Sequence, residues 1–177
     1  MHLSDGVLAW WSPQIRGVLL PEEMRVSRSL RQSAGRYTTT VDNDFAGVID
    51  GCADPGRPGG WIRPEIRDAY VELHRLGWAH SVETRDNGDL VGGLYGVAIG
   101  GLFAGESMFF RNRDASKVAL LALASRLVSV PNALIDVQWP TDHLKTLGVV
   151  EMSRRNYLRV LPTALEATVP SGFWDWD

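Results

Sequence analysis

The segment from Leu90 to Phe110, which reads LVGGLYGVAIGGLFAGESMFF, carries the strongest indication of the fold. Two apolar runs, residues 90–99 and 102–110, lie on either side of the pair Gly100-Gly101, and each has the length of a β-strand. Just upstream, Asn87-Gly88 is typical of a two-residue hairpin turn and follows another short strand-like segment. The sequence therefore predicts an antiparallel meander of three strands.

Helical patterns are predicted on both sides of this meander. Two precede it, at 43–53 and between Pro64 and Gly77, and a long apolar one follows at 115–130, with Asp114 as its expected N-cap. Segment 133–138 then reads as one more strand, which a crossover through the long helix would place parallel to its neighbour. Helices segregated against a mainly antiparallel sheet predict an α+β domain.

The bulk composition excludes several classes of protein. The chain has 177 residues, a net charge of -3 and one cysteine, Cys52, so neither a disulfide framework nor a zinc cluster built from cysteines is expected. No apolar run approaches the roughly 20 residues of a membrane span, and the first residues lack the pattern of a signal peptide. We therefore expect a cytoplasmic protein.

One carboxylate, Glu106, interrupts the apolar strand at 102–110. Strict alternation along a strand would place it on the same face as Ala104 and Met108. An unpaired carboxylate among such neighbours is costly. Glu106 is therefore either a structural residue, paired with an arginine or reaching solvent, or a charge at the floor of a pocket.

A second polar pair lies in the strand at 133–138. Asp136 and Gln138 are two residues apart, so they share a face, and Leu134, Ile135 and Val137 around them indicate burial. One reading is a hydrogen-bonded pair that joins the sheet to a helix. The other is a relay in which Asp136 orients the side-chain amide of Gln138 and the amide oxygen accepts a proton or a hydrogen bond.

Five arginines gather in a short span near the N-terminus whose only acids are Glu22 and Glu23: Arg16, Arg25, Arg28, Arg31 and Arg36. Such a run is either a solvated helix face or a set of contacts to the phosphates of a nucleic acid. Other chemistry has weaker signals. The glycine cluster lacks a phosphate-binding pattern, Gly105-Glu-Ser-Met lacks the second glycine of a nucleophile elbow, and the histidines have no metal-like spacing.

Several blocks occur together in a fixed order: WWSPQIRGVL, WIRPEIRDAYVELHRLGWAHSVE, DLVGGLYGVAIGGLFAGESMF, ASKVALL, LIDVQ and LGVVEMSRRNYL. Together they resemble the bacterial leucyl/phenylalanyl-tRNA–protein transferase family over nearly the whole chain. The resemblance implies an acetyltransferase-like (GNAT or Fem-like) domain. It implies transfer of Leu or Phe, and less readily Met, from aminoacyl-tRNA to the N-terminal Arg or Lys of proteins, feeding N-degron proteolysis. It implies no metal and no small cofactor, and we expect a monomer that acts away from membranes.

The resemblance also assigns roles to residues. It implies that Gln138, held by Asp136, receives or polarises the acceptor amine, and that Glu106 helps to position the aminoacyl group. Trp61 would stack near the terminal adenosine. The side-chain pocket for Leu or Phe would be formed by Leu94, Phe103, Met108 and Ile135, and the tRNA stem would be held by Arg25, Arg28, Arg31 and Arg36.

The chain departs from the family pattern at its start. Family members carry a small N-terminal domain before WWSP, so residues 1–15 are expected to be a remnant of that domain's junction and residues 16–177 the catalytic domain. Phe110 also replaces the small polar residue usual after ESMF. Two alternatives remain open: an acyltransferase of the same fold with another donor such as acyl-CoA, or an inactive remnant that binds tRNA or protein.

Overall fold

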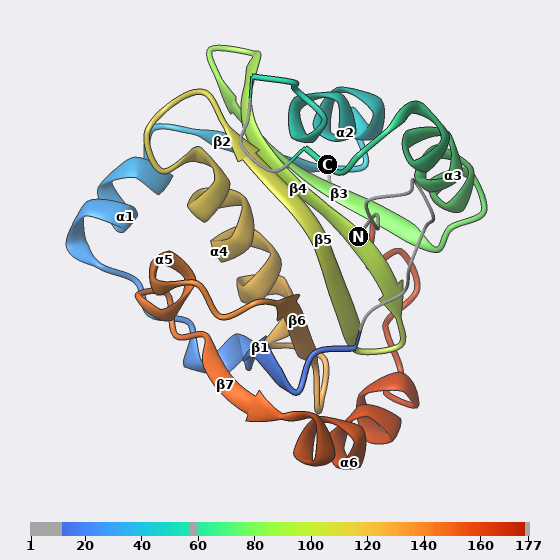
Figure 1. The fold of residues 1–177 in the computed structure, drawn as a ribbon. Coiled ribbons are helices and arrows are strands. Elements are labelled where there is room, and N and C mark those ends of the chain that lie inside the picture. Colours follow the sequence, from blue (N-terminus) through green and yellow to red (C-terminus); the bar gives the residue numbers. More distant parts are fainter. Residues whose placement is uncertain (1–11, 57–59, 176–177) are drawn as a thin grey trace.

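The computed structural model describes residues 12–56 and 60–175. Within them, seven strands form one sheet in the order β2-β3-β4-β5-β6-β1-β7 (Figure 1). The strands are β1 (Ile15–Leu19), β2 (Thr38–Val41), β3 (Ala79–Asp86), β4 (Asp89–Ile99), β5 (Leu102–Phe110), β6 (Leu134–Gln138) and β7 (Val150–Ser153). The helices are η1 (Pro21–Glu23), α1 (Arg28–Ala34), α2 (Phe45–Cys52), α3 (Pro64–Arg75), α4 (Ala115–Leu127), α5 (Asp142–Lys145) and α6 (Arg154–Leu165). Of these described helices, none is long and apolar enough to cross a membrane.

The predicted meander is confirmed as β3, β4 and β5, which pair antiparallel in chain order. Asn87 and Gly88 form the first turn with φ of 52° and 92°, the left-handed conformation that this hairpin turn requires. At the second turn Gly100 has φ 55°, and a Cβ there would meet the carbonyl of Leu165. Glycine is therefore required at position 100 both by conformation and by close packing.

β5 and β6 form the parallel pair in a sheet whose other pairs are antiparallel. Helix α4 is the crossover between them, as predicted for the segment at 133–138. Their pairing extends over only three residues of each strand, Leu102–Ala104 against Leu134–Asp136. The α+β class with a mainly antiparallel sheet is confirmed, and β5 and β6 stop pairing where the two predicted polar positions begin.

Helices cover both faces of the sheet (Figure 1). On one face, which we call the α4 face, Leu123 of α4 packs into a cluster with Leu94, Phe103 and Ile135. On the other, the α2/α3 face, a second cluster contains residues from α2, α3, β4 and β5: Phe45, Tyr70, Tyr95 and Phe109. Tyr157 of α6 packs on a third cluster with Val18 of β1 and Leu134 of β6. The polar residues of β5 and β6 therefore lie between two apolar layers.

Two details of the fold differ from expectation. Asp114 precedes α4 but does not cap it with its side chain, and its backbone is left-handed, with φ of 61°, instead of the extended conformation typical of a capping residue. That carboxylate instead accepts from Ser33 Oγ at 3.0 Å and pairs with Lys117 at 2.9 Å. The sequence also gave no signal for β2, a half-exposed edge strand whose threonines pair with β3. Residues 1–11 of the expected N-terminal remnant lie outside the described residues.

Candidate functional site

The candidate site lies where β5 and β6 separate. Beyond Ala104 and Asp136 the strands no longer pair, and the side chain of Gln138 bridges them. Its Nε2 donates to the Gly105 carbonyl at 3.1 Å and lies 3.2 Å from Glu106 Oε2. Because a backbone carbonyl can only accept, the atom near Gly105 must be the amide nitrogen. The amide oxygen of Gln138 therefore points away from Gly105.

Glu106 occupies a β-bulge. Tyr95 pairs with Ser107 while Gly96 pairs with Gly105, so Glu106 is the additional residue on β5. This breaks the alternation assumed from the sequence. Met108 packs against the α4-face cluster, whereas Glu106 hydrogen-bonds with Tyr70 of the α2/α3 face. The prediction that Glu106 and Met108 share a face was wrong, since the additional residue, Glu106 itself, shifts the alternation of β5 by one position.

The carboxyl of Glu106 has an unusual environment. Burial raises its pKa above the ordinary value, and the charge of Asp136 adds to this. Hydrogen bonds with Tyr70 and Gln138 and the nearby Arg16 oppose the rise. Burial and the same carboxylate raise the pKa of the Tyr70 hydroxyl, so Tyr70 stays a donor. The charged form of Glu106 is therefore less favourable in the folded protein than in water.

The raised pKa of Glu106 predicts that the stability of the fold depends on pH. A carboxyl with a raised folded-state pKa stabilises the fold while it is protonated, and the contribution is lost as the pH rises through that pKa. Replacing Glu106 by glutamine should therefore raise the melting temperature, relative to wild type, more at about pH 8 than at about pH 4. Thermal melts of both proteins across this range measure the difference. A difference that is the same at both pH values would contradict the raised pKa.

Asp136 is 1% exposed, and both of its carboxylate oxygens accept hydrogen bonds. Arg16 donates to its Oδ2 from Nε at 3.0 Å and from Nη2 at 2.5 Å, and Tyr157 hydrogen-bonds with the same carboxylate. Its Oδ1 accepts from the backbone N–H of Gln138 at 2.8 Å. The expected contact between Asp136 and the side-chain amide of Gln138 was wrong. Asp136 holds the backbone of Gln138 and not its side chain. The alternation that would place both side chains on one face is also broken, since Val18 pairs with Asp136 and Gly17 with Gln138, which leaves Val137 as an additional residue on β6.

The backbone of Gln138 is itself unusual, because its φ is 62°. A residue with a long side chain in the left-handed region costs about 1–3 kcal/mol and persists only where its surroundings hold it there. The next peptide continues the turn, since Trp139 N–H donates to the Val137 carbonyl at 2.7 Å. Strained positions held by several contacts cluster at functional sites.

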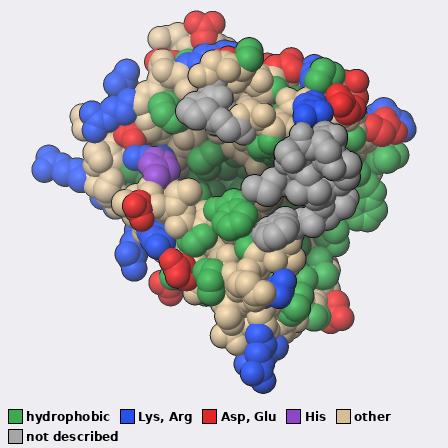
Figure 2. All heavy atoms as spheres, viewed as in Figure 1, with side chains coloured by type: hydrophobic (Ala, Val, Ile, Leu, Met, Phe, Trp, Pro, Cys, Tyr) green, Lys and Arg blue, Asp and Glu red, His purple; other side chains and the backbone are tan. Residues whose placement is uncertain are grey.

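The remaining residues assigned by resemblance lie in two places. Leu94, Phe103 and Ile135 belong to the α4-face cluster and are at most 3% exposed, and half-buried Met108 packs at the edge of that cluster. Trp61 is half-buried against the α2/α3-face cluster, which also contains Tyr70. The face viewed in Figure 1 is hollowed near its centre, with hydrophobic side chains at the bottom of the hollow (Figure 2).

The arginine run divides into two groups. Arg16 points into the site and is bound to Asp136, so it is not free to contact phosphate. The other four are exposed, on α1 or directly beside it, and none has an ion pair with an acid within the described residues: Arg25, Arg28, Arg31 and Arg36. Unpaired exposed cations are suited to contact nucleic-acid phosphates.

Three side chains of the site were missed from the sequence: Arg16, Tyr70 and Tyr157. Tyr70 belongs to the helix predicted between Pro64 and Gly77, where an aromatic residue is most simply explained by core packing, and it is 8% exposed. Tyr157 is likewise buried by α6. Arg16 and Asp136 are 120 positions apart, and no local pattern marks such a pair.

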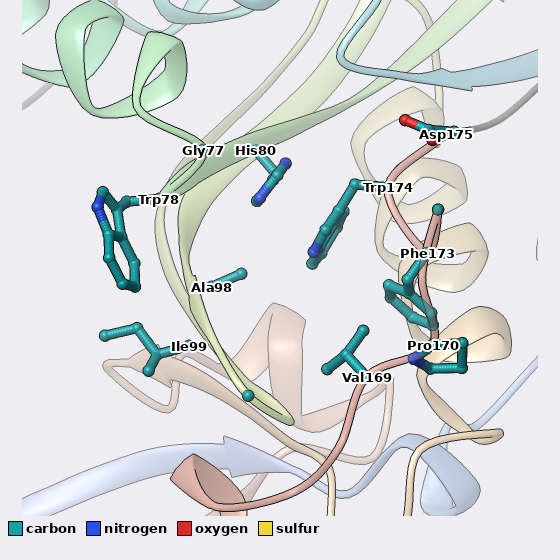
Figure 3. Close-up of a pocket in the computed structure, with 12 residues that line it drawn as sticks. Gly77, Trp78, His80, Ala98, Ile99, Val169, Pro170, Phe173, Trp174 and Asp175 are labelled. Carbon is teal, nitrogen blue, oxygen red and sulfur yellow. The ribbon is translucent and has the colours of Figure 1, made fainter.

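A separate cavity of about 440 Å³ lies away from these polar groups. It is an open pocket lined by the turn before β3, the end of β4 and the segment after α6, with Trp78 and Ile99 on one side (Figure 3). Trp174 stacks on His80 with ring centroids 4.1 Å apart. None of the residues assigned by resemblance lines it. Within the described part of the chain, no three His, Cys, Asp or Glu side chains are grouped to hold a metal.

Comparisons with known proteins agree with the resemblance seen in the sequence. The family model described as "Leucyl/phenylalanyl-tRNA protein transferase" matches residues 18–162. The protein of that name from Aromatoleum aromaticum is 52% identical over 160 residues, which cover 88% of this chain and 68% of the relative. The one from Pseudomonas putida (strain W619) is 51% identical over 163 residues, covering 90% and 72%.

Among solved structures, L-PGS from Bacillus licheniformis aligns with a TM-score of 0.48 at 13% identity, over 93% of this chain and 54% of its own. A conserved protein of unknown function from Bacteroides thetaiotaomicron aligns with a TM-score of 0.43 at 13% identity, over 75% and 53%. The sequence relatives carry the assignment, since the family model spans most of the chain and the identities reach half. The chain belongs to the leucyl/phenylalanyl-tRNA–protein transferase family.

Proposed function

We propose that this protein transfers leucine or phenylalanine, and less readily methionine, from aminoacyl-tRNA to the N-terminal arginine or lysine of acceptor proteins. The product would enter N-degron proteolysis in the cytoplasm. The observation that carries the proposal is the convergence of Glu106, Asp136 and Gln138, from two strands, into one hydrogen-bonded group where β5 and β6 separate. Family membership supplies the donor and the acceptor.

The reaction needs no further activation of the donor, because the aminoacyl ester is already activated. The neutral α-amine of the acceptor attacks the ester carbonyl carbon, a C–N bond forms, and the bond to the ribose oxygen breaks. The proton lost by the amine ends on that oxygen. Orientation of the two bound reactants can remove about 7–11 kcal/mol from such a barrier. The protein's main task is therefore to position the amine and the ester.

Gln138 is suited to receive the amine. Both hydrogens of its Nε2 face acceptors on β5, Gly105 and Glu106, which leaves its amide oxygen to accept from the acceptor's N–H. Glu106, fixed by Tyr70 and Gln138, would lie beside the aminoacyl group and help to position it. Trp61 would stack on the terminal adenine, a contact worth about 1–3 kcal/mol per base.

The side chain of the transferred amino acid would pack against the α4-face cluster, next to the point where β5 and β6 separate. Met108 is half-buried there and flexible, so it can turn aside and let Leu or Phe reach the buried wall formed by Leu94, Phe103 and Ile135. An apolar pocket excludes charged side chains by desolvation. It separates Leu from Met only weakly, because the two side chains are apolar and similar in size, and even a whole methylene is worth only about 1–3 kcal/mol.

The direct test is transfer of labelled phenylalanine from Phe-tRNA to a peptide that begins with arginine. We expect label in the peptide, and none in the same peptide with an acetylated N-terminus, since the nucleophile is then blocked. Thermal shift with an aminoacyl-adenosine analogue and with acetyl-CoA separates the acyl-CoA alternative: we expect stabilisation by the analogue alone. Label transfer that is absent with every aminoacyl-tRNA would reject the proposal and favour an inactive binding protein.

The exposed arginines on α1 carry a separate prediction. Replacing Arg28 and Arg31 together by alanine should weaken tRNA binding and flatten the slope of log affinity against log salt by about 1 to 2, because each phosphate contact contributes close to one. The matched control is Arg155 and Arg159, exposed on α6, replaced in the same way. Binding titrations over a range of salt concentrations measure both. An unchanged slope in the α1 variant removes these residues from the tRNA site.

A further inference from the structure

Gln138 can present its amide oxygen in one direction only if its backbone is held. Its φ of 62° lies in the left-handed region, which glutamine seldom adopts. The contact that opposes relaxation is the hydrogen bond from its backbone N–H to Asp136 Oδ1 at 2.8 Å. The direction of the side chain toward Gly105 and Glu106 follows from this backbone conformation. Whatever orients the carboxylate of Asp136 therefore orients Gln138.

Arg16 of β1 orients that carboxylate. Two of its nitrogens, Nε and Nη2, both donate to Oδ2 of Asp136. This occupies one carboxylate oxygen and presents the other, Oδ1, to the backbone of Gln138. The guanidinium in turn lies 4.6 Å from the centre of the Tyr157 ring, and Tyr157 hydrogen-bonds with Asp136. The Arg16 side chain is 16% exposed and that of Asp136 is 1% exposed, so neither is free to reorient in water.

β1 also constrains the residues that follow Gln138. Gly17 pairs with Gln138 at an irregularity in the β1–β6 register. A Cβ on Gly17 would lie 2.9 Å from the nitrogen of Pro140 and 3.0 Å from the backbone carbon of Trp139. The turn at 139–140 therefore packs directly on the backbone of β1. Arg16 and Gly17, adjacent in the chain, therefore contact the residues before and after Gln138: Arg16 binds Asp136, and Gly17 packs on the turn at 139–140.

We propose that Arg16 is a positioning residue for the transfer reaction, which acts through the Asp136 carboxylate to hold Gln138 in its left-handed conformation. It is not a contact to tRNA phosphate, although it belongs to the arginine-rich span. The proposal rests on the proposed function for the reaction, while the geometry it describes exists without substrate. The two can therefore be tested separately.

The kinetic test replaces Arg16 by methionine, which keeps the length of the side chain without donors. We expect kcat for transfer to fall about 10- to 100-fold while KM for Phe-tRNA changes less than about twofold, since the loss concerns orientation in the transition state. Arg16→Lys should recover part of the rate, because it restores the charge and one donor. A raised KM with unchanged kcat and a salt slope flattened by about 1 would identify a phosphate contact and overturn the proposal.

The second test needs no substrate. Hydrogen exchange of the Gln138 backbone amide, followed by NMR on the free protein, should be at least about tenfold faster in Arg16→Met than in wild type. The matched control, Arg28→Met on the exposed face of α1, should leave it unchanged. Equal exchange in Arg16→Met and wild type overturns the proposal even if transfer is confirmed. Failure of the wild-type protein to transfer phenylalanine rejects the proposed function and leaves this measurement valid.

Variants that act by another route keep the proposal testable if Arg16→Met does not fold. Arg16→Met combined with Asp136→Asn removes both charges, so it should fold and remain slow in transfer. Gly17→Ala should also lower kcat, because its Cβ displaces the turn that follows Gln138 while the Arg16–Asp136 pair stays intact. A wild-type kcat in both variants would show that Gln138 does not depend on this arrangement.

Discussion

Replacing Gln138 by alanine should lower kcat for phenylalanine transfer by about 100-fold or more, the usual cost of losing one preorganised polar contact to reacting atoms. The variant lacks the oxygen that would accept from the acceptor amine, and it also lacks the Nε2 that bridges to Gly105 and Glu106. Single-turnover transfer from Phe-tRNA to a peptide that begins with arginine measures the effect. Because the two lost hydrogen bonds are worth about 1 kcal/mol each, the variant should still fold.

Two controls separate the amide from its backbone. Gln138→Asn keeps an amide and tolerates the left-handed φ, but its shorter side chain cannot span the gap to β5, so it should be about as slow as the alanine variant. Phe110→Ser, at a position 64% exposed at the end of β5, should transfer at the wild-type rate. Wild-type turnover in both Gln138 variants would show that this side chain does not take part in the reaction.

Replacing Asp136 by alanine should destabilise the protein by about 3–5 kcal/mol, the cost of removing one partner from a buried ion pair. The loss of stability should lie toward the lower end of this range, since the Arg16 side chain is 16% exposed and water can reach the unpaired guanidinium. At about 2–4 °C per kcal/mol for a chain of this size, the melting temperature should drop by roughly 6–20 °C. Urea unfolding of the wild type and the variant gives the free energies directly.

We expect the destabilisation of Asp136→Ala to come from the uncompensated charge of Arg16, which a second substitution can test. Adding Arg16→Met to Asp136→Ala should restore part of the stability, because both charges are then absent. Transfer should stay slow in the double variant, since nothing holds the backbone of Gln138. Equal stability of the single and double variants would mean that the buried arginine charge is not the source of the loss.

Much of the site could be read in the sequence, as Asp136 and Gln138 show. Their polar side chains within an apolar strand marked both positions, and Glu106 was marked by its apolar neighbours. The irregularity in the β1–β6 register between Asp136 and Gln138 was not visible in the sequence. The partner of Asp136 could not be read, because Arg16 is 120 positions away and is one of five arginines in its span. The face of Glu106 was misread because a bulge depends on how β4 and β5 pair, which one strand's residues do not specify.

Local sequence patterns were enough to predict the meander, the crossover helix and the residue types available for chemistry. These depend on local preferences, such as the left-handed turn at Asn87-Gly88, and on apolar periodicity, which each segment carries within itself. The folded arrangement was needed to learn which oxygen of Asp136 faces Gln138, which arginine is half-buried against Asp136, and where β5 and β6 separate. Those outcomes depend on contacts between distant segments, whose energies exist only once the strands have come together.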